Sequence, residues 1–275
     1  MPSGRLTEDI IQRYLRALEV TRREPGAEAL AELVAAHVMR VPFENISKLY
    51  RKKRLGLTGL PGIELFLDGI EQYHFGGTCY SNNFHLYTLL ASLGYRVKLC
   101  GADMTNPDVH MVIMVEVNGR EYLVDGGYAA PFLSPLPRDL GEDYVVALGR
   151  DRYVLKPQDQ AGCSRLEMYR DGVLKHGYLA KPMARKIEDF GGVIADSFRP
   201  SATFLNALLL ARFYRDRSVV IHNLSVIESR GTEATIRSLG SLEKLVAEVE
   251  GQFNIPREVV SDAVSDLPEL VDAWG

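Results

Sequence analysis

A cysteine that follows two glycines is the residue of this sequence best suited to nucleophilic chemistry. The segment HFGGTC ends at Cys79, and an apolar periodic run over residues 80–93 predicts a helix that begins beside it. Unpaired backbone N–H groups and the helix dipole favour negative charge at such an end, so the thiolate of Cys79 is easier to form. Cys79 is therefore the candidate nucleophile. The other two cysteines, Cys100 and Cys163, lie in strand-like patterns with no glycine turn before them, which predicts buried, inert thiols.

A base for this nucleophile lies on a predicted β-hairpin. Strand-like runs over residues 109–117 and 120–124 flank Asn118-Gly119, and these two residue types accept the positive φ angles of a type I′ turn. With a two-residue turn, Val117 lies opposite Arg120, which fixes the register of the whole hairpin.

Counting back along this register places His110 and Asp125 on one face as diagonal neighbours, about 7 to 8 Å apart at the backbone. An aspartate that accepts one ring N–H fixes the tautomer and leaves the other ring nitrogen to take a proton from a thiol. Cys79, His110 and Asp125 would thus form a Cys-His-Asp triad. Taken singly, His110 also fits a strand-end histidine and Asp125 a turn residue before two glycines. The other histidines lack a comparable argument: His85 lies in the cysteine's own helix, and packing or surface positions are expected for His37, His176 and His222.

The elements that must position these residues are helices first and short strands afterwards. Thr7 is the predicted N-cap of an amphipathic helix, and a second helix over residues 27–38 ends at Val41-Pro42, because the residue before proline avoids helical geometry. After Gly94 the apolar period changes from 3.6 to 2, and Ser241 caps a final helix. The predicted strands lie at residues 97–101, 109–117, 120–124, 144–148, 153–156, 164–169 and 218–227. This order predicts an α+β protein.

Composition excludes several classes of protein. The 275 residues are 46% hydrophobic and 25% charged, which suffices for a substantial core without metal or disulfide staples. A net charge of −4 argues against nucleic acid as a partner, and the basic run Arg51–Arg54 fits a solvated surface segment. The three widely spaced cysteines suit neither a disulfide framework nor a metal site. With no apolar run of membrane length and a charged start, we expect a cytoplasmic protein that binds no metal, nucleic acid or membrane.

At this point nearly the whole chain resembles the arylamine N-acetyltransferases. The resemblance rests on segments that match the family in order: VPFENI at Val41–Ile46, GGTC at Gly76–Cys79 followed by Asn83, Val109-His110, YLVD at Tyr122–Asp125, and SATF at Ser201–Phe204.

The resemblance implies a papain-like cysteine-enzyme core in three parts. These are a helical bundle over residues 1–95 with the nucleophile, an antiparallel β-barrel over 96–195 with the histidine and aspartate, and an α/β lid over 196–275. It implies two-step acetyl transfer from acetyl-CoA, the co-substrate, to an arylamine or hydrazine. It further assigns Ser201, Phe204 and Gly127 to coenzyme A and Phe43 and Tyr128 to the acceptor.

Some positions depart from the family pattern. Phe75 stands where the family usually has an arginine before the two glycines, and Ser81 stands where it has an acidic or amide residue. An arginine there would help to order the loop and its carboxylate partners, so we expect Glu44 to be paired differently in this chain. After Asp125, the residues Gly126-Gly127-Tyr128 replace a more usual x-Gly-Phe.

Two other functions fit the same residues. One is a further cysteine acyl-transfer enzyme on the same fold, such as an amide synthase, a transglutaminase-like protein or a thiol hydrolase. A papain-like protease would usually end its triad in asparagine and space its histidine much farther from the cysteine. The other is a catalytically weak relative that binds coenzyme A or a partner protein.

Overall fold

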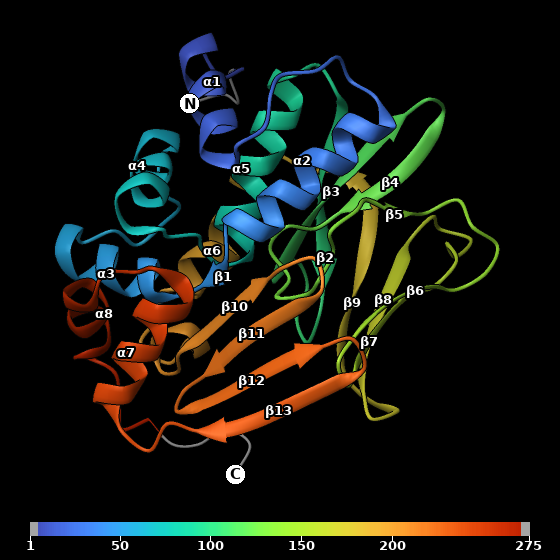
Figure 1. The fold of residues 1–275 in the computed structure, drawn as a ribbon. Helices are drawn as coiled ribbons and strands as arrows, with labels where there is room; N and C mark the ends of the chain where they lie inside the picture. The colour runs from blue at the N-terminus through green and yellow to red at the C-terminus, as the bar shows by residue number, and fades with distance from the viewer. Residues whose placement is uncertain (1–4, 271–275) are drawn as a thin grey trace.

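A computed structural model describes residues 5–270 of the chain. Its first part is helical (Figure 1). The helices in this part are α1 (Glu8–Leu18), α2 (Ala27–Arg40), α3 (Ile46–Leu55), α4 (Ile63–Tyr73) and α5 (Cys79–Ser92). Thr7 caps α1, as predicted, because its side chain accepts a hydrogen bond from the backbone N–H of Ile10. Helix α2 ends at Val41-Pro42, also as predicted.

The larger sheet is antiparallel throughout and curls into a nearly closed barrel. Its strands, in spatial order, are β5 (Leu136–Pro137), β4 (Arg120–Val124), β3 (His110–Val117), β2 (Arg96–Asp103), β9 (Val173–Ala184), β8 (Ser164–Arg170), β7 (Asp151–Leu155) and β6 (Tyr144–Leu148). Asn118 and Gly119 have φ angles of 53° and 76°, and Val117 pairs with Arg120. The predicted hairpin and its register are therefore confirmed.

A second antiparallel sheet joins an early segment to the C-terminal part of the chain. Its strands are β1 (Phe43–Glu44), β10 (Leu209–Phe213), β11 (Arg217–His222), β12 (Ser225–Arg230) and β13 (Glu233–Ser238), in that spatial order. The helices α7 (Leu242–Phe253) and α8 (Arg257–Val264) pack against it, and Figure 1 shows both beside α3. The short helices η1 (Ile187–Phe190), α6 (Gly191–Asp196) and η2 (Thr203–Leu205) connect the two sheets.

One prediction for this region is wrong. The apolar run 218–227 forms two strands rather than one, because the chain turns at Asn223, whose φ angle of 52° lies in the left-handed region. His222 pairs with Ser225 across this turn. In addition, no strand was predicted for β1, β5, β9 or β13.

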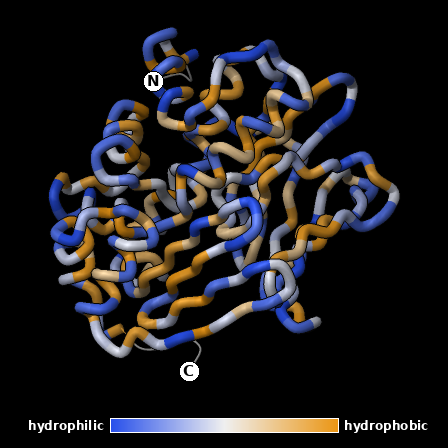
Figure 2. The backbone as a smooth tube through the Cα atoms, in the orientation of Figure 1, coloured by the Kyte–Doolittle hydropathy of each residue, from blue (hydrophilic) through white to orange (hydrophobic). Residues whose placement is uncertain are grey.

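The core that positions the site lies between the first helices and the back of β3. Buried side chains of α1, α2, α4 and α5 pack in one cluster with Ile113, Val115 and Val117 of β3. In Figure 2 the hydrophobic stretches follow the strands and inner sides of the helices, and hydrophilic stretches occupy the loops at the rim. The α+β class is therefore confirmed, and its packing brings the start of α5 to the start of β3. Within residues 5–270, every helix is too short or too polar to cross a bilayer.

A buried asparagine fastens the segment before β10 to the start of α3. The Asn45 side-chain amide donates to the carbonyl oxygens of Phe204 at 3.0 Å and Ala207 at 2.7 Å. Its Oδ1 accepts the backbone N–H of Leu209 at 2.9 Å. Asn45 is fully buried, so no water can replace it as the partner of these three backbone groups.

Replacing Asn45 with leucine should therefore destabilise the protein by about 3 kcal/mol or more, because three backbone groups would be left without partners in the interior. Urea unfolding followed by circular dichroism measures this loss. The matched control is Asn206→Leu, since Asn206 also bonds nearby carbonyl oxygens but is exposed, and its replacement should cost less than about 1 kcal/mol. Equal losses in the two variants would contradict this account of Asn45.

Candidate active site

Cys79 is the first residue of α5, where the sequence placed it. Thr78, in extended backbone, precedes the helix, and the first intrahelical bond runs from the N–H of Asn82 to its carbonyl at 3.0 Å. The N–H groups of the first turn therefore have no acceptor within the helix and give this end a partial positive charge. Cys79 is only 9% exposed. Its sulfur thus lies in a largely dry environment that still favours negative charge.

The two glycines before Cys79 are needed for backbone contact. Gly77 donates its N–H to the carbonyl oxygen of Pro42 at 3.3 Å and accepts the N–H of Glu44 at 3.1 Å, so the loop pairs with β1. A Cβ atom at Gly76 would lie 1.9 Å from the Pro42 oxygen. No side chain fits there, and the loop is held in one position next to the nucleophile.

Glu44 orders this loop through backbone groups. Its Oε1 accepts the N–H of Gly76 at 3.0 Å, and its Oε2 accepts the N–H of Ser47 at 2.8 Å. Burial raises the pKa of Glu44, while these hydrogen bonds and the positive charge of Arg51 oppose the rise. Glu44 is thus held by backbone N–H groups, and that its pairing differs from the family pattern stays a prediction.

The positive charge near Glu44 comes from α3 instead of from the position of Phe75. Arg51 is 4% exposed, donates to the carbonyl oxygen of Leu65 at 3.0 Å and lies over the Phe75 ring at 5.4 Å. The prediction of a solvated surface run from Arg51 to Arg54 is therefore wrong for its first residue. Because α3 packs Arg51 toward the loop, its guanidinium lies inside the protein, while Lys52, Lys53 and Arg54 are exposed.

His110 and Asp125 form the pair that the hairpin register predicts. His110 is the first residue of β3, and its Nε2 lies 2.8 Å from Oδ2 of Asp125, which directly follows β4. Each residue is 2% exposed. Because Asp125 occupies Nε2, the Nδ1 atom is the nitrogen left for the Cys79 sulfur, with which His110 also interacts. The three residues of the predicted triad are therefore brought together.

A residue that sequence reasoning left out of the site completes it. Asn83, one turn after Cys79 on α5, donates from Nδ2 to Oδ1 of Asp125 at 2.8 Å and to the carbonyl oxygen of Met111 at 2.7 Å. Its Oδ1 accepts the N–H of Gly126 at 2.8 Å. The i, i+4 spacing from Cys79 was the available signal, since it places both side chains on one face of the helix.

The electrostatics of the pair favour a charged imidazole. Burial alone would lower the pKa of His110, but the Asp125 carboxylate and the Cys79 sulfur outweigh it and raise that pKa to about 10. The rings of Tyr128 and Tyr178 pack on the imidazole with centroids at 5.5 and 4.9 Å. They exclude water from the pair, and no sequence signal pointed to Tyr178.

The residues that the resemblance assigns to the substrates lie around this centre. The ring of Phe43 meets that of Phe204 at 5.6 Å, and Ser201 is exposed beside η2. A Cβ atom at Gly127 would lie 2.7 Å from the Cα of Cys79, so only glycine fits there. Tyr128 contacts His176 through its hydroxyl group. The acceptor and coenzyme roles of these residues stay predictions.

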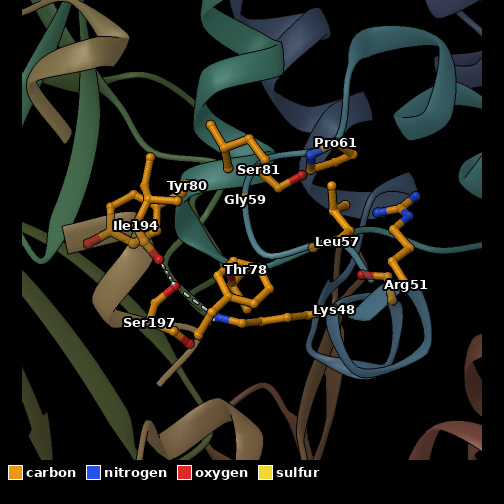
Figure 3. Close-up of a pocket in the computed structure, with 14 residues that line it drawn as sticks. Lys48, Arg51, Leu57, Gly59, Pro61, Thr78, Tyr80, Ser81, Ile194 and Ser197 are labelled. Atoms are coloured by element: carbon orange, nitrogen blue, oxygen red, sulfur yellow. Dashed lines mark hydrogen bonds between the residues drawn. The ribbon is translucent and has the colours of Figure 1, made fainter. Parts of the chain in front are cut away.

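A narrow pocket lies beside the loop before Cys79 (Figure 3). Gly77, Thr78 and Ser81 line it together with Lys48 from α3. Lys48 donates from Nζ to the carbonyl oxygen of Ser197 at 2.6 Å and to its Oγ at 2.8 Å. Burial lowers the pKa of Lys48 to about 8, and its interaction with Cys79 opposes this shift.

The other two cysteines differ from Cys79. Cys100 is buried in β2, as predicted, and burial raises its pKa to about 12. Cys163 lies in the loop before β8 and is half-buried, so its predicted burial within a strand is wrong. Burial raises the pKa of Cys163 as well. Neither thiol has the helix terminus or the imidazole that would activate a nucleophile.

We expect NMR titration to separate the buried histidines into two classes. His110 should stay protonated to about pH 10, whereas His37, whose pKa burial lowers to about 3, should stay neutral down to that pH. Because the pKa of His110 is raised on folding, its pair with Asp125 should stabilise the fold fully below about pH 6.5 and lose this effect as the pH rises toward 10. In Asp125→Asn the Cys79 sulfur alone opposes the effect of burial, so the pKa of His110 should fall well below about 10. A wild-type His110 that titrates near pH 6.5 would contradict this electrostatic account.

Known proteins of one family are similar to this chain in sequence. A family model described as N-acetyltransferase matches residues 27–260. The pineal gland isozyme NAT-3 of Gallus gallus, an arylamine N-acetyltransferase, is 31% identical over 141 residues, which cover 48% of this chain and 47% of that protein. Arylamine N-acetyltransferase 1 of Homo sapiens is 24% identical over 140 residues, 47% of each chain. The chain thus spans about half the length of the curated relatives it matches.

Solved structures share the fold over almost the whole chain. The arylamine N-acetyltransferase of Mycobacterium marinum in complex with CoA has a TM-score of 0.78 and 22% identity, over 94% of this chain and 100% of that one. The Nocardia farcinica arylamine N-acetyltransferase has a TM-score of 0.75 and 22% identity, over 93% and 94% of the two chains. The fold agrees with the family model, which covers most of the sequence. The chain belongs to the arylamine N-acetyltransferase family.

Proposed function

We propose that this protein transfers an acetyl group from acetyl-CoA to an arylamine or hydrazine by way of a thioester on Cys79. The observation that carries the proposal is the buried array in which Cys79, at the start of α5, meets an imidazole held by Asp125. A nucleophile, its base and a group that orients the base are the parts that covalent acyl transfer needs.

In the first half-reaction, the Cys79 thiolate attacks the carbonyl carbon of acetyl-CoA. The carbon–sulfur bond to coenzyme A then breaks, and the acetyl group stays on Sγ of Cys79. The protonated imidazole of His110 gives its proton to the departing thiolate of coenzyme A, so His110 becomes neutral. Its raised pKa keeps it protonated until the thiolate charge has moved to the leaving group.

In the second half-reaction, neutral His110 acts as the general base. The amine nitrogen attacks the thioester carbonyl on Cys79, and His110 takes a proton from that nitrogen. The bond between carbon and Sγ breaks, which releases the N-acetylated product and restores the thiolate beside the imidazolium. Asp125 orients the ring in both halves through its bond to Nε2.

The start of α5 supplies stabilisation for the tetrahedral intermediates. The backbone N–H of Cys79 belongs to the first turn, where no intrahelical acceptor exists, and it lies next to the sulfur that carries the acyl group. A donor fixed in a dry site stabilises a developing oxyanion without reorganisation. The Cys79 N–H is therefore our candidate for the oxyanion site.

Acetyl-CoA as donor is supported by the solved relative in complex with CoA. We assign Ser201, Phe204 and Gly127 to the coenzyme, and Phe43 and Tyr128 to the aromatic acceptor. Three free thiols among the described residues fit the cytoplasmic location that we expect, since that compartment keeps thiols reduced.

Mixing the protein with acetyl-CoA and no amine should release about one CoA per active site in a burst, because the acyl-enzyme accumulates when no acceptor is present. Intact-mass analysis should then find one acetyl group on the protein. Adding an aromatic amine or a hydrazine should discharge it onto nitrogen and give parallel lines in double-reciprocal plots.

Cys79→Ala is the control for this experiment, and Cys100→Ala should behave as wild type. An equal adduct on Cys79→Ala, or none on the wild type, would end the acetyltransferase proposal. An amide synthase would load a longer acyl chain and ignore small aromatic amines. A weak CoA-binding relative would show neither the burst nor the transfer.

Replacing Asp125 with asparagine should lower kcat/KM by about a hundredfold or more while the fold survives. The amide keeps the shape of the carboxylate but removes the charge that stabilises the imidazolium and selects its tautomer. The matched control is Asp139→Asn, because Asp139 pairs with Arg120 at the exposed end of the same hairpin. Near-normal turnover of Asp125→Asn would show that another group orients His110.

A further inference from the structure

We propose that the pocket between Lys48 and Ser81 binds the carboxylate of an acidic substrate whose reacting end lies at Cys79. This proposal rests on the function above and deepens it, since it names the chemical class that the site prefers. The pocket lies between α3, the loop before α5 and the segment after α6, and neither Phe43 nor Tyr128 lines it.

Lys48 brings an ammonium group to this pocket without an acidic partner. Figure 3 shows its side chain crossing the pocket to Ser197, whose two oxygens accept two of its three N–H groups. Its Nζ also lies 4.1 Å from the centroid of the Phe198 ring. Within residues 5–270, no carboxylate forms an ion pair with Lys48. One donor of this largely buried group, and its positive charge when Lys48 is protonated, are therefore available to a ligand.

Ser81 brings a second unused group to the same pocket. Its Oγ is buried and, among the described residues, has no hydrogen-bond partner, although the residue is only 6% exposed. Ser81 is the third residue of α5, so it lies in the turn whose N–H groups carry the positive end of the helix dipole. A buried hydroxyl without a partner is costly unless something supplies an acceptor. A carboxylate oxygen would do so.

The remaining charges near the pocket also favour an anion. Arg51 lines it as a second buried cation. Two acids interact with Arg51. The oxygens of Glu44 already accept the N–H groups of Gly76 and Ser47, and Asp68 pairs with Arg13. A carboxylate in this pocket would be attracted by both cations, whereas an uncharged group would not.

The size of the pocket limits what enters it. Its volume is ≈ 30 Å³, which is the space of about two water molecules. A carboxylate has this size, and an aromatic ring does not. Only the charged end of a substrate would therefore occupy the pocket. Thr78 lines it and adjoins Cys79 in the chain, and Lys48 is near enough to interact electrostatically with the cysteine, so the reacting end would lie at the sulfur.

The carboxylate could belong to the acyl group or to the amine, and two assays distinguish them. Acyl loading without amine compares succinyl-CoA with acetyl-CoA, and acetyl transfer compares 4-aminobenzoate with aniline. In one of these pairs, Lys48→Met should reduce the ratio of kcat/KM for the acidic over the neutral compound by about ten- to a hundredfold. Ser81→Ala should reduce the same ratio less.

Three control variants separate charge recognition from structural effects. Lys48→Arg should keep most of the preference because it retains the cation. Ser197→Ala removes one bond of Lys48 but leaves its charge, so the preference should persist. Lys53→Met removes an exposed cation from the same helix and should change neither ratio. Thermal unfolding of each variant verifies that it is folded.

Direct binding makes the test independent of turnover. Calorimetric titration of Cys79→Ala with 4-aminobenzoate, aniline, succinyl-CoA and acetyl-CoA should show tighter binding of one acidic compound, which Lys48→Met abolishes. If acyl loading fails but this binding difference is found, the proposed function is wrong and the carboxylate pocket stands. If loading succeeds and Lys48→Met changes neither ratio nor binding, the carboxylate pocket is wrong and the transferase proposal stands.

Discussion

The Asp125 carboxylate links helix α5 to strand β3 at the candidate active site. Its Oδ2 bonds the imidazole of His110, and its Oδ1 accepts Asn83 from α5 and the N–H of Gly127. Cys79 lies one turn before Asn83, so the distance from sulfur to imidazole depends on this carboxylate. Three hydrogen bonds fix the position of this carboxylate, so it orients the imidazole and lies next to the charge of an imidazolium.

Close backbone contacts keep this arrangement rigid. A Cβ atom would collide with Pro42 at Gly76 and with Cys79 at Gly127, so both loops pack against the site by their main chains. Backbone contacts of this kind leave few rotamers to rearrange, and a nucleophile positioned by them loses little entropy when substrate arrives. Glu44 adds to this rigidity, because it binds the backbone of Gly76 from within the interior.

Patterns of neighbouring residues predicted those parts of the structure that depend on contacts between neighbouring residues. The Asn118-Gly119 turn fixes its own hairpin, and from that register the pairing of His110 with Asp125 followed by counting. Residues 218–227 divide into two strands because Asn223 has a left-handed φ angle. The apolar composition of this run favours one continuous strand, so the turn was not predicted. The burial of Arg51 could not be predicted either, because it depends on how α3 packs on segments that are distant in the sequence.

The two departures from the family pattern have different physical consequences. Phe75 replaces an arginine, yet Arg51 returns a positive charge to Glu44 from another helix, so the loop before Cys79 keeps its support. Ser81 replaces a larger polar residue, and no other side chain takes the place of the lost polar group. The Ser81 and Lys48 side chains line a small pocket that has no acidic residue in its lining. The first change preserves the catalytic geometry and the second leaves unbalanced positive charge beside it. Because charge in a dry site acts strongly on whatever binds there, we expect the second change to affect which substrates bind.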